Sequence, residues 1–391
     1  MAIDKKVLNV PHLRFPEFSG EWKKYSFNDI AQYKKGPFGS ALKKEIFVPK
    51  SADSVKIYEQ QNAIKKDWEL GRYYISRDYF INHMQQFIVE AGDIIVSCAG
   101  TIGEIYELPP NAVSGVFNQA LMRVRINATL IDKNIFIKVF SSMIDSFSKI
   151  YSNGSAIKNI PPFADLKKTN VFLPTQNEQY KISRLISLLD ERIATQNKII
   201  EDLKKLKSAI SLNVLHSDTW EQFKIKDIAK IGRGRVISSI EISQQKNPTY
   251  PVYSSQTSNN GIMGYLDDYM FEGEHISWTT DGANAGTVFY RNGKFNCTNV
   301  CGLLKFRKEF DTYFVSLVLA EATKKYVSIN LANPKLMNNT MGNIQIRLPK
   351  LEEQKRISIV FRELQKLWTV HNSLLTKYTK QKQYLLSQMF I

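Results

Sequence analysis

The sequence predicts an α+β protein in which two similar domains are separated by a long antiparallel two-helix coiled coil, arranged as an internal duplication with pseudo-two-fold symmetry. Three observations predict this fold. The start of each half repeats, the end of each half repeats, and each half closes with a heptad stripe of the same length. With 391 residues, of which 43% are hydrophobic, the chain is long enough for two or three compact units with sizeable cores.

The openings of the two halves match. The run WKKYSFNDIA at residues 22–31 reappears as WEQFKIKDIA at residues 220–229, an offset of 198 residues. Further in, the sequence around Tyr58 and Gln61 matches that around Tyr253 and Gln256, and GDI at 92–94 is echoed by GEH at 273–275. The remaining interiors diverge. An array of small solenoid repeats needs at least about three units, so the pattern indicates duplication of one large unit.

The ends of the two halves match as well. Leu-Pro, Glu-Gln and Lys-Ile-Ser at residues 173–183 correspond to Leu-Pro, Glu-Gln and Arg-Ile-Ser at residues 348–358, an offset of 175 residues. Together with the openings, these endings predict four parts. They are a first domain at 1–175, a first helix at 176–216, a second domain at 217–350 and a second helix at 351–391.

Each predicted long helix carries an apolar stripe with steps of four and three residues. Eight of ten positions are apolar or aromatic in each stripe, and the polar interruptions coincide, Gln196 with His371 and Lys207 with Lys382. Nearly five heptads span roughly 50 Å at 1.5 Å per residue, which favours two helices that pair along a seam over an amphipathic helix on a globular core. His371 is therefore interpreted as a polar seam residue and not as a metal ligand. The predicted seam comprises Ile182, Ile186, Leu189, Ile193, Gln196, Ile200, Leu203, Lys207, Ile210, Val214, Ile357, Phe361, Leu364, Trp368, His371, Leu375, Tyr378, Lys382, Leu385 and Met389.

The interiors of the two halves, residues 15–171 and 220–346, mix short apolar or β-branched runs with turn residues. The clearest predicted strands are residues 93–97 and 120–125, and residues 134–150 have the pattern of a helix. This mixture predicts two α+β domains.

The charge balance favours a polyanionic partner. The chain has 53 basic and 37 acidic residues, a formal charge of +16, and neutralising phosphates releases condensed counterions, so nucleic acid is the leading candidate. The three cysteines, Cys98, Cys297 and Cys301, form neither a disulfide framework nor a zinc motif, which fits a reducing cytoplasm. Residues 1–10 lack an apolar run, and nowhere in the sequence do eighteen apolar residues stand together, so neither secretion nor membrane insertion is expected.

We expect no active site and no metal site in this chain. The run NIPPF at residues 159–163 is similar to the Asn-Pro-Pro-Tyr/Phe loop of amino-methyltransferases, but Ile160 separates the asparagine from the prolines, so we interpret it as a turn before a strand. Paired carboxylates such as Asp67 with Glu69 lack a third ligand or a partner lysine for nuclease chemistry. The run GTIG at 100–103 lacks the terminal lysine of a phosphate-binding loop.

Several motifs together resemble one family. They are PHLRFPEFSGEW at 11–22, GDIIVSCAGTIG at 92–103 and YPVYSS at 250–255, combined with the repeated Leu-Pro, Glu-Gln and long-helix endings. Over essentially its whole length the chain resembles the specificity subunits of type I restriction-modification systems.

This resemblance implies two target-recognition domains, each reading one half of a bipartite site on double-stranded DNA. It implies that the helical spacer sets the gap between the half-sites and binds two methyltransferase (modification) subunits, in a complex that includes restriction/translocase subunits. The chain itself is then non-catalytic, cytoplasmic and without a cofactor, while S-adenosylmethionine, ATP and Mg²⁺ belong to the partner subunits.

Candidate DNA contacts combine cations, hydroxyls and amides in turn-rich segments, because phosphates attract cations and base edges need donors and acceptors. We hypothesise that Arg233 or Arg235 pairs with guanine through two hydrogen bonds, and that Gln61 or Gln256 pairs with adenine. Ordinary solvated loops are the alternative for any one of these residues. The candidates are Lys34, Lys35, Ser40, Lys43, Lys44, Gln60, Gln61, Asn62, Ser97 and Thr101 in the first half, and Arg233, Arg235, Ser254, Ser255, Gln256, Thr280 and Asn284 in the second.

Two other functional classes stay open at this point. One is a stand-alone DNA methyltransferase or nuclease with a divergent active site. The other is a coiled-coil scaffold that joins proteins and never reads DNA sequence.

Overall fold

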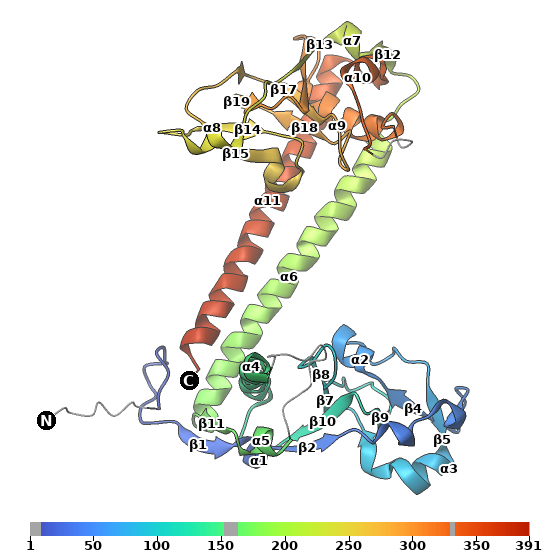
Figure 1. Cartoon of the computed structure of the whole chain (residues 1–391), viewed down its shortest axis with the longest axis vertical. Coiled ribbons are helices and arrows are strands. Elements are labelled where there is room, and N and C mark those ends of the chain that lie inside the picture. The colour runs from blue at the N-terminus through green and yellow to red at the C-terminus, as the bar shows by residue number, and fades with distance from the viewer. Residues whose placement is uncertain (1–8, 152–162, 329–332, 391) are drawn as a thin grey trace, which may run out of the picture. The chain divides into compact units, whose positions relative to one another are not determined.

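The computed structural model describes residues 9–151, 163–328 and 333–390, which fall into two compact units (Figure 1). Unit 1 consists of Met1–Ala194 and Thr376–Ile391, and unit 2 consists of Thr195–Leu375. Each unit contains one mixed domain and a length of both long helices, α6 (Gln176–Val214) and α11 (Leu351–Gln388). The predicted α+β class with two similar domains is confirmed. The predicted turn at residues 159–162 lies outside the described residues.

The first domain is built on a four-stranded antiparallel sheet. Its order is β2 (Ala31–Lys35), β10 (Leu121–Ile126), β7 (Ile94–Ser97) and β8 (Ile105–Glu107). A second sheet has the order β3 (Phe47–Val48), β5 (Tyr74–Ser76), β4 (Ser54–Tyr58), β9 (Gly115–Phe117) and β6 (Ile88–Val89), and β1 (Lys23–Ser26) pairs with β11 (Asn170–Leu173). The helices of this domain are α1 (Phe27–Ile30), α2 (Gln60–Lys65), α3 (Arg77–Tyr79), α4 (Lys133–Tyr151) and α5 (Phe163–Lys168).

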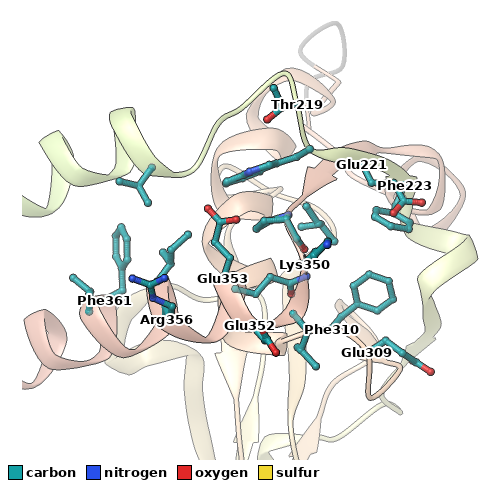
Figure 2. Close-up of a pocket in the computed structure, with 18 of the residues that line it drawn as sticks. Thr219, Glu221, Phe223, Glu309, Phe310, Lys350, Glu352, Glu353, Arg356 and Phe361 are labelled. Atoms are coloured by element: carbon teal, nitrogen blue, oxygen red, sulfur yellow. Dashed lines mark hydrogen bonds between the residues drawn. The ribbon is translucent and has the colours of Figure 1, made fainter.

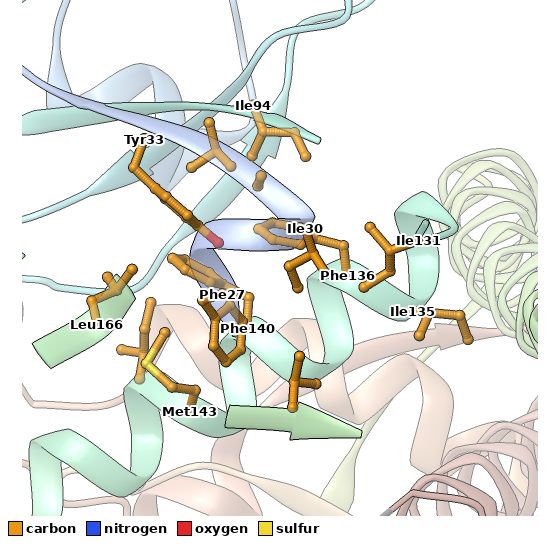
Figure 3. Close-up of a cluster of buried hydrophobic side chains, with 14 of the residues drawn as sticks. Phe27, Ile30, Tyr33, Ile94, Ile131, Ile135, Phe136, Phe140, Met143 and Leu166 are labelled. Carbon is orange, nitrogen blue, oxygen red and sulfur yellow. The ribbon is translucent and has the colours of Figure 1, made fainter. Parts of the chain in front are cut away.

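Successive side chains on a strand point to opposite faces of its sheet. In the four-stranded sheet of the first domain, apolar side chains cover both faces. Ile94 and Val96 of β7 join the core formed with helix α4, in which Phe140 lies 5.8 Å from Phe27 between ring centroids (Figure 3). Ile95, between them, belongs to the cluster on the opposite face, with side chains from the second sheet. The predicted strands at 93–97 and 120–125 and the predicted helix at 134–150 are found as β7, β10 and α4.

The second domain repeats this architecture. Its four-stranded sheet has the order β13 (Ala229–Arg233), β20 (Cys301–Phe306), β17 (His275–Thr279) and β18 (Val288–Arg291). The second sheet has the order β15 (Ile262–Leu266), β14 (Tyr250–Tyr253), β19 (Lys294–Cys297) and β16 (Phe271–Glu272), and β12 (Glu221–Lys224) pairs with β21 (Gln345–Leu348). The helices are α7 (Ile225–Ile228), α8 (Ser239–Ser243), α9 (Thr312–Ala322) and α10 (Asn338–Asn343).

One detail of the sequence repeat differs from the structure. The sequence aligns GDI at 92–94 with GEH at 273–275, which would place His275 opposite Ile94. The strand register instead equates Ile94, which pairs with Val124, with Ile276, which pairs with Leu304. The turn before β17 therefore holds one residue more than the turn before β7.

Helices α6 and α11 pack antiparallel within each unit. In unit 1, Asp190 forms an ion pair with Lys382. In unit 2, Gln196 Oε1 lies 2.7 Å from His371 Nδ1, so the two polar seam residues hydrogen-bond to each other. All twenty positions of the predicted seam are buried or partly buried. Across the described ranges, no helix combines the length and the apolar character needed to cross a membrane.

A buried glutamine fixes the start of each long helix to its domain. Gln179 is 1% exposed, its Oε1 accepts from the backbone N–H of Asp132 at 2.7 Å, and its Nε2 donates to the carbonyl oxygens of Leu130 and Pro174 at 2.9 and 3.0 Å. Gln354 is also 1% exposed and makes the same kind of contacts. Its Oε1 accepts from the backbone N–H that begins α9, at 2.9 Å, and its Nε2 donates to the carbonyl oxygen of the preceding Leu-Pro turn at 2.8 Å.

We expect Gln354→Ala to lower the stability of unit 2. The substitution leaves a partly buried N–H and a buried carbonyl without their present partner, which costs about 2 kcal/mol. In a unit of this size that corresponds to a fall in Tm of roughly 4–8 °C, measured by circular dichroism. Gln381→Ala, at an exposed position in the part of the same helix that belongs to unit 1, is the control and should leave the Tm of unit 2 unchanged. Equal Tm values for the two variants would contradict the anchoring role.

Candidate nucleic-acid interface

Strand register brings the candidate segments of the first domain to one end of its main sheet. Lys35, at the end of β2, pairs with Met122, and Ser97, at the end of β7, pairs with Leu121 at the start of β10. Strands β4 and β9 run parallel and end side by side, at Tyr58 and Phe117. The loops that leave β2, β4, β7 and β9 therefore emerge together.

These loops are tied to one another by backbone contacts. Gly36 follows β2, and a Cβ atom at this position would lie 2.0 Å from the carbonyl oxygen of Asn118, in the turn between β9 and β10. Gln60, which follows β4, donates to the carbonyl oxygens of Ala99 and Thr101 in the loop after β7, the second at 2.9 Å. The loop tips therefore form one connected surface and not a set of independent loops.

Several predicted DNA contacts in the first domain are accessible on or near this surface. Lys35, Ser40, Gln61 and Thr101 are exposed. Lys34 is partly buried, and its ammonium group donates to the side-chain oxygen of Gln86 at 2.8 Å.

Two further predicted contacts lie at the far end of the loop that follows β2. Lys43 and Lys44 are exposed just before β3, an edge strand of the second sheet. The contacts that join the loops after β2, β4, β7 and β9 do not involve these two lysines in the described part of the chain.

Two predicted contacts of the first domain are instead internal supports. Asn62 is fully buried, and its amide nitrogen donates to the carbonyl oxygens of Asp67 and Leu70 at 2.8 and 2.7 Å. Ser97 is also fully buried, and its hydroxyl oxygen accepts from the backbone N–H of Glu104 at 2.9 Å. Groove edges cannot reach either side chain in this conformation, so we assign both to holding the loops in place.

The second domain gathers the equivalent segments by the same register. Arg233, at the end of β13, pairs with Gly302, and Thr279, at the end of β17, pairs with Cys301. A Cβ atom at Gly234 would lie 1.6 Å from the carbonyl oxygen of Cys297, so this glycine occupies the place of Gly36 in the first domain. Only glycine allows so close an approach between two backbones.

The predicted arginines of the second domain already have partners. Arg235 is exposed and forms a two-pronged ion pair with Glu241, and this hydrogen bond raises the pKa of the arginine. Arg233 Nε donates to the side-chain oxygen of Asn338 at 2.9 Å. A contact of either arginine with guanine would therefore require it to share or leave its present partner.

Some of the other predicted residues of this domain hydrogen-bond to the backbone of neighbouring loops, and others are exposed or partly buried. Thr280 is 2% exposed and donates to the carbonyl oxygen of Val300 at 3.0 Å, so it holds the turn between β19 and β20. Gln256 donates to the carbonyl oxygen of Ile262. Asn284 is exposed. Ser254 and Ser255 are partly buried at the end of β14.

Sequence reasoning missed the residues at the tips of the turns between β9 and β10 and between β19 and β20. Gln119 and Asn299 occupy equivalent places in the two turns, at an offset of 180 residues that the strand register sets. Both side chains are exposed, and neither amide has a hydrogen-bond partner within the described residues. Exposed amides suit adenine, which offers one donor and one acceptor in the major groove.

A second pair that the sequence did not single out is apolar. Phe38 and Val236 stand at the offset of 198 that relates the two openings, and they are 90% and 72% exposed. Apolar side chains at a DNA surface contact thymine methyl groups or wedge between base steps. The sequence could have related these two residues through their shared offset of 198. It could not have shown that both side chains are exposed, because residue type does not determine exposure.

A buried arginine lies behind the turn between β19 and β20. Arg291 is 2% exposed, its guanidinium carbon lies 3.6 Å from the ring centroid of Tyr253, and its Nε donates to Ser277 Oγ at 2.9 Å. Among the residues that the structure describes, its Nη2 atom and the hydroxyl of Thr298 are buried without hydrogen-bond partners. Burial lowers the pKa of Arg291. Its guanidinium adds a positive charge at this end of the domain, which favours an anionic partner.

Potential metal ligands are not clustered on this surface. In the part of the chain that the structure describes, no group of three or more histidine, cysteine, aspartate or glutamate side chains is arranged to hold a metal ion. The cysteines Cys98, Cys297 and Cys301 are free and buried, and burial raises the pKa of Cys98 to about 12.

A family comparison accounts for both halves of the chain. The model of the type I restriction modification DNA specificity domain matches residues 19–205 and 217–377, so each match takes in one domain and most of the long helix that follows it. The chain belongs to this family of type I restriction-modification specificity proteins.

Individual relatives agree with this assignment. The type I restriction enzyme MpnII specificity subunit of Mycoplasma pneumoniae is 43% identical over 150 residues, which are 38% of this chain and 44% of that subunit. This chain thus covers less than half of that relative. Another M. pneumoniae protein, described as the N-terminus of a type I specificity subunit, is 46% identical over 140 residues, which are 35% of this chain and 74% of that protein.

Two solved structures share the fold. The S subunit of a type I restriction-modification system from M. genitalium has a TM-score of 0.65 and 18% sequence identity, over 98% of this chain and 99% of that one. A chain from a study of complex assembly and conformational transition in the type I restriction-modification system has a TM-score of 0.56 and 14% identity, over 94% of this chain and 97% of that one.

We expect Gly36→Ala to disturb the loop surface of the first domain. The new methyl group would lie 2.0 Å from the carbonyl oxygen of Asn118, so the turn between β9 and β10 must move, at a cost of about 1–3 kcal/mol. Faster amide hydrogen exchange in that turn and a lower Tm are the measurements. Gly39→Ala is the control, because a Cβ atom there meets nothing within 4 Å. An unchanged exchange pattern in Gly36→Ala would show that the two loops are not coupled.

Proposed function

We propose that this chain is the DNA-specificity subunit of a type I restriction-modification complex. Each domain reads one half of a bipartite site on double-stranded DNA through the surface formed by the loops after β2, β4, β7 and β9, or after β13, β14, β17 and β19. The observation that carries the proposal is that strand register gathers equivalent loops in the two domains while the residues in those loops differ.

Charge and side-chain chemistry support a DNA partner. The net charge of +16 suits phosphate binding, which positions a protein on the duplex. The exposed amides of Gln119 and Asn299 supply the base-edge chemistry that sequence reading requires. Because the two domains present different side chains on the same frame, they would read different half-sites.

The long helices are proposed to set the gap between the half-sites and to bind two methyltransferase subunits, to which restriction/translocase subunits are added. The support is an apolar outer surface on the helices. Leu206 is 48% exposed, Leu212 75%, Ile359 61% and Val370 53%. Exposed apolar residues along paired helices are typical of surfaces that a partner covers.

We also propose that the chemistry belongs to the partner subunits. In this proposal S-adenosylmethionine, ATP and Mg²⁺ bind there, and this chain is non-catalytic. The proposal rests on membership of a family of specificity proteins. Methylation of DNA by the purified chain alone, supplied with methyl donor, would contradict it and would support the alternative of a stand-alone methyltransferase.

Methylome sequencing of cells with and without this gene tests the proposed function. We expect a methylated motif made of two defined parts and an unspecified gap to disappear when the gene is deleted, because the partners would lose their only source of sequence recognition. Restoring the gene should restore the motif. An unchanged methylome in cells that express the methyltransferase subunits would favour the scaffold alternative.

We expect Gln119→Ala and Asn299→Ala to act on different halves of the motif. Losing an amide that pairs with a base edge costs about 1–3 kcal/mol of discrimination at that base pair. Methylome sequencing of cells carrying each variant should show relaxed sequence preference at one position of one half-site, with the other half-site unchanged. Each variant thereby serves as the control for the other. Relaxation of both halves by either variant would contradict separate reading.

A further inference from the structure

The two halves of the chain differ at the first turn of the long helices. In the first half, the segment at residues 9–20 packs against the start of α6. Arg14 donates from Nε and Nη2 to the two carboxylate oxygens of Glu178, both at 2.7 Å, and Glu178 is fully buried. The indole nitrogen of Trp22, which is 4% exposed, donates to the same carboxylate at 3.4 Å. A two-pronged arginine–carboxylate pair of this kind is among the strongest polar contacts in proteins.

Aromatic residues complete the packing of this segment. Phe15 and Phe18 meet edge to face with ring centroids 6.5 Å apart, and Phe15 joins the core of the first domain. The ammonium group of Lys181 lies 6.0 and 5.7 Å from the two ring centroids and forms an ion pair with Glu17. The segment therefore supplies an arginine, two rings and a carboxylate to the start of α6.

The second half contains the residues equivalent to Glu178 and Trp22 but lacks a segment equivalent to residues 9–20. The chain passes from the end of α6 at Val214 to β12 at Glu221 through LHSDTW, which has no counterpart of RFPEF. Glu353 stands where Glu178 stands in the first half, and Trp220 stands where Trp22 stands. Glu353 is exposed and Trp220 half-buried. Within the described residues, neither the Glu353 carboxylate nor the Trp220 indole nitrogen has a hydrogen-bond partner.

An open pocket of about 1040 Å³ occupies this place in unit 2, and Figure 2 shows the side chains around it. Trp220, Phe310 and Val360 contribute apolar surface to its lining. Its charged lining is mainly acidic, because four carboxylates stand against two cations. These are Glu221, Glu309, Glu352 and Glu353, against Lys350 and Arg356. Although the whole chain has a net charge of +16, the acidic lining of this pocket favours a positively charged ligand.

We propose that this pocket binds an extended segment of a partner protein that presents an arginine followed directly by a phenylalanine, as residues 14–15 do in the first half. The arginine pairs with Glu353, and the aromatic ring packs beside Trp220 and Val360. The segment belongs to a protein subunit of the restriction-modification complex, and this identification of the partner rests on the proposed function.

A second copy of this chain is the less favourable occupant. Its own residues 9–20 are already held by Glu178, whose carboxylate is fully buried. Removing Arg14 to fill the pocket of another molecule would leave that buried carboxylate unpaired, which is strongly destabilising. A separate protein carries no such cost.

A peptide probe tests the chemistry of the pocket without the partner. The probe is the labelled peptide VPHLRFPEFSGE, residues 10–21 of this chain, titrated with the full-length protein and followed by fluorescence anisotropy. We expect saturable binding that Glu353→Gln weakens about ten- to hundredfold, because the ion-paired hydrogen bonds are lost. Changing the arginine of the peptide to alanine should have the same effect. Glu363→Gln is the control, because Glu363 is exposed on the same helix, pairs with Lys366 and does not line the pocket.

No binding, or equal binding by Glu353→Gln and the unchanged protein, would overturn the proposal. Photocrosslinking identifies the occupant, with a benzophenone amino acid at position 360 in a complex reconstituted with methyltransferase subunits. A crosslink to an Arg-Phe segment of a partner subunit supports the proposal. A crosslink to residues 9–20 of a second copy, or no crosslink to protein, overturns it. If the protein does not bind the peptide but deletion of the gene removes a bipartite methylated motif, this inference alone is refuted. If the protein binds the peptide but deletion of the gene leaves the methylome unchanged, only the proposed function is refuted.

Discussion

The structure depends on a buried amide at the junction between each domain and its helix. Gln179 and Gln354 are each 1% exposed. In each, the amide nitrogen donates to the Leu-Pro turn and the amide oxygen accepts from the backbone at the start of α4 or α9. A buried amide is tolerated only when its partners are in place, so the junction accepts one geometry. The direction of each long helix relative to its own domain is thereby fixed.

A rigid junction allows the loop surface to vary without loss of the fold. In both domains the main sheet supplies the same strand order, and the loops leave it at the same end. Gly36 and Gly234 bring two of those loops into backbone contact, and this contact is independent of the side chains that the loops carry. Lys35 and Arg233, or Gln119 and Asn299, can therefore differ between the halves while the frame stays the same. The contacts that hold the frame and the side chains that the loops expose are thus different residues.

The sequence predicted the parts of the fold that periodicity and repetition encode. The helix seam followed from steps of four and three, and the two-domain plan followed from the offsets of 198 and 175 residues. The loop surface was predicted less well. Asn62 and Ser97 have polar side chains of the right kind, but burial turns them into loop supports. Gln119 was missed because an isolated amide between short strands gives no pattern, and only strand register reveals its counterpart Asn299.

The seam between the long helices carries a further constraint through its polar contacts. Apolar heptads alone permit α11 to slide along α6 by one heptad with little change in buried surface, whereas a paired polar residue penalises the slide. Gln196 meets His371 in unit 2, and Asp190 meets Lys382 in unit 1, so a slide of one heptad would part both pairs. The polar contacts therefore select one register of the two long helices within each unit.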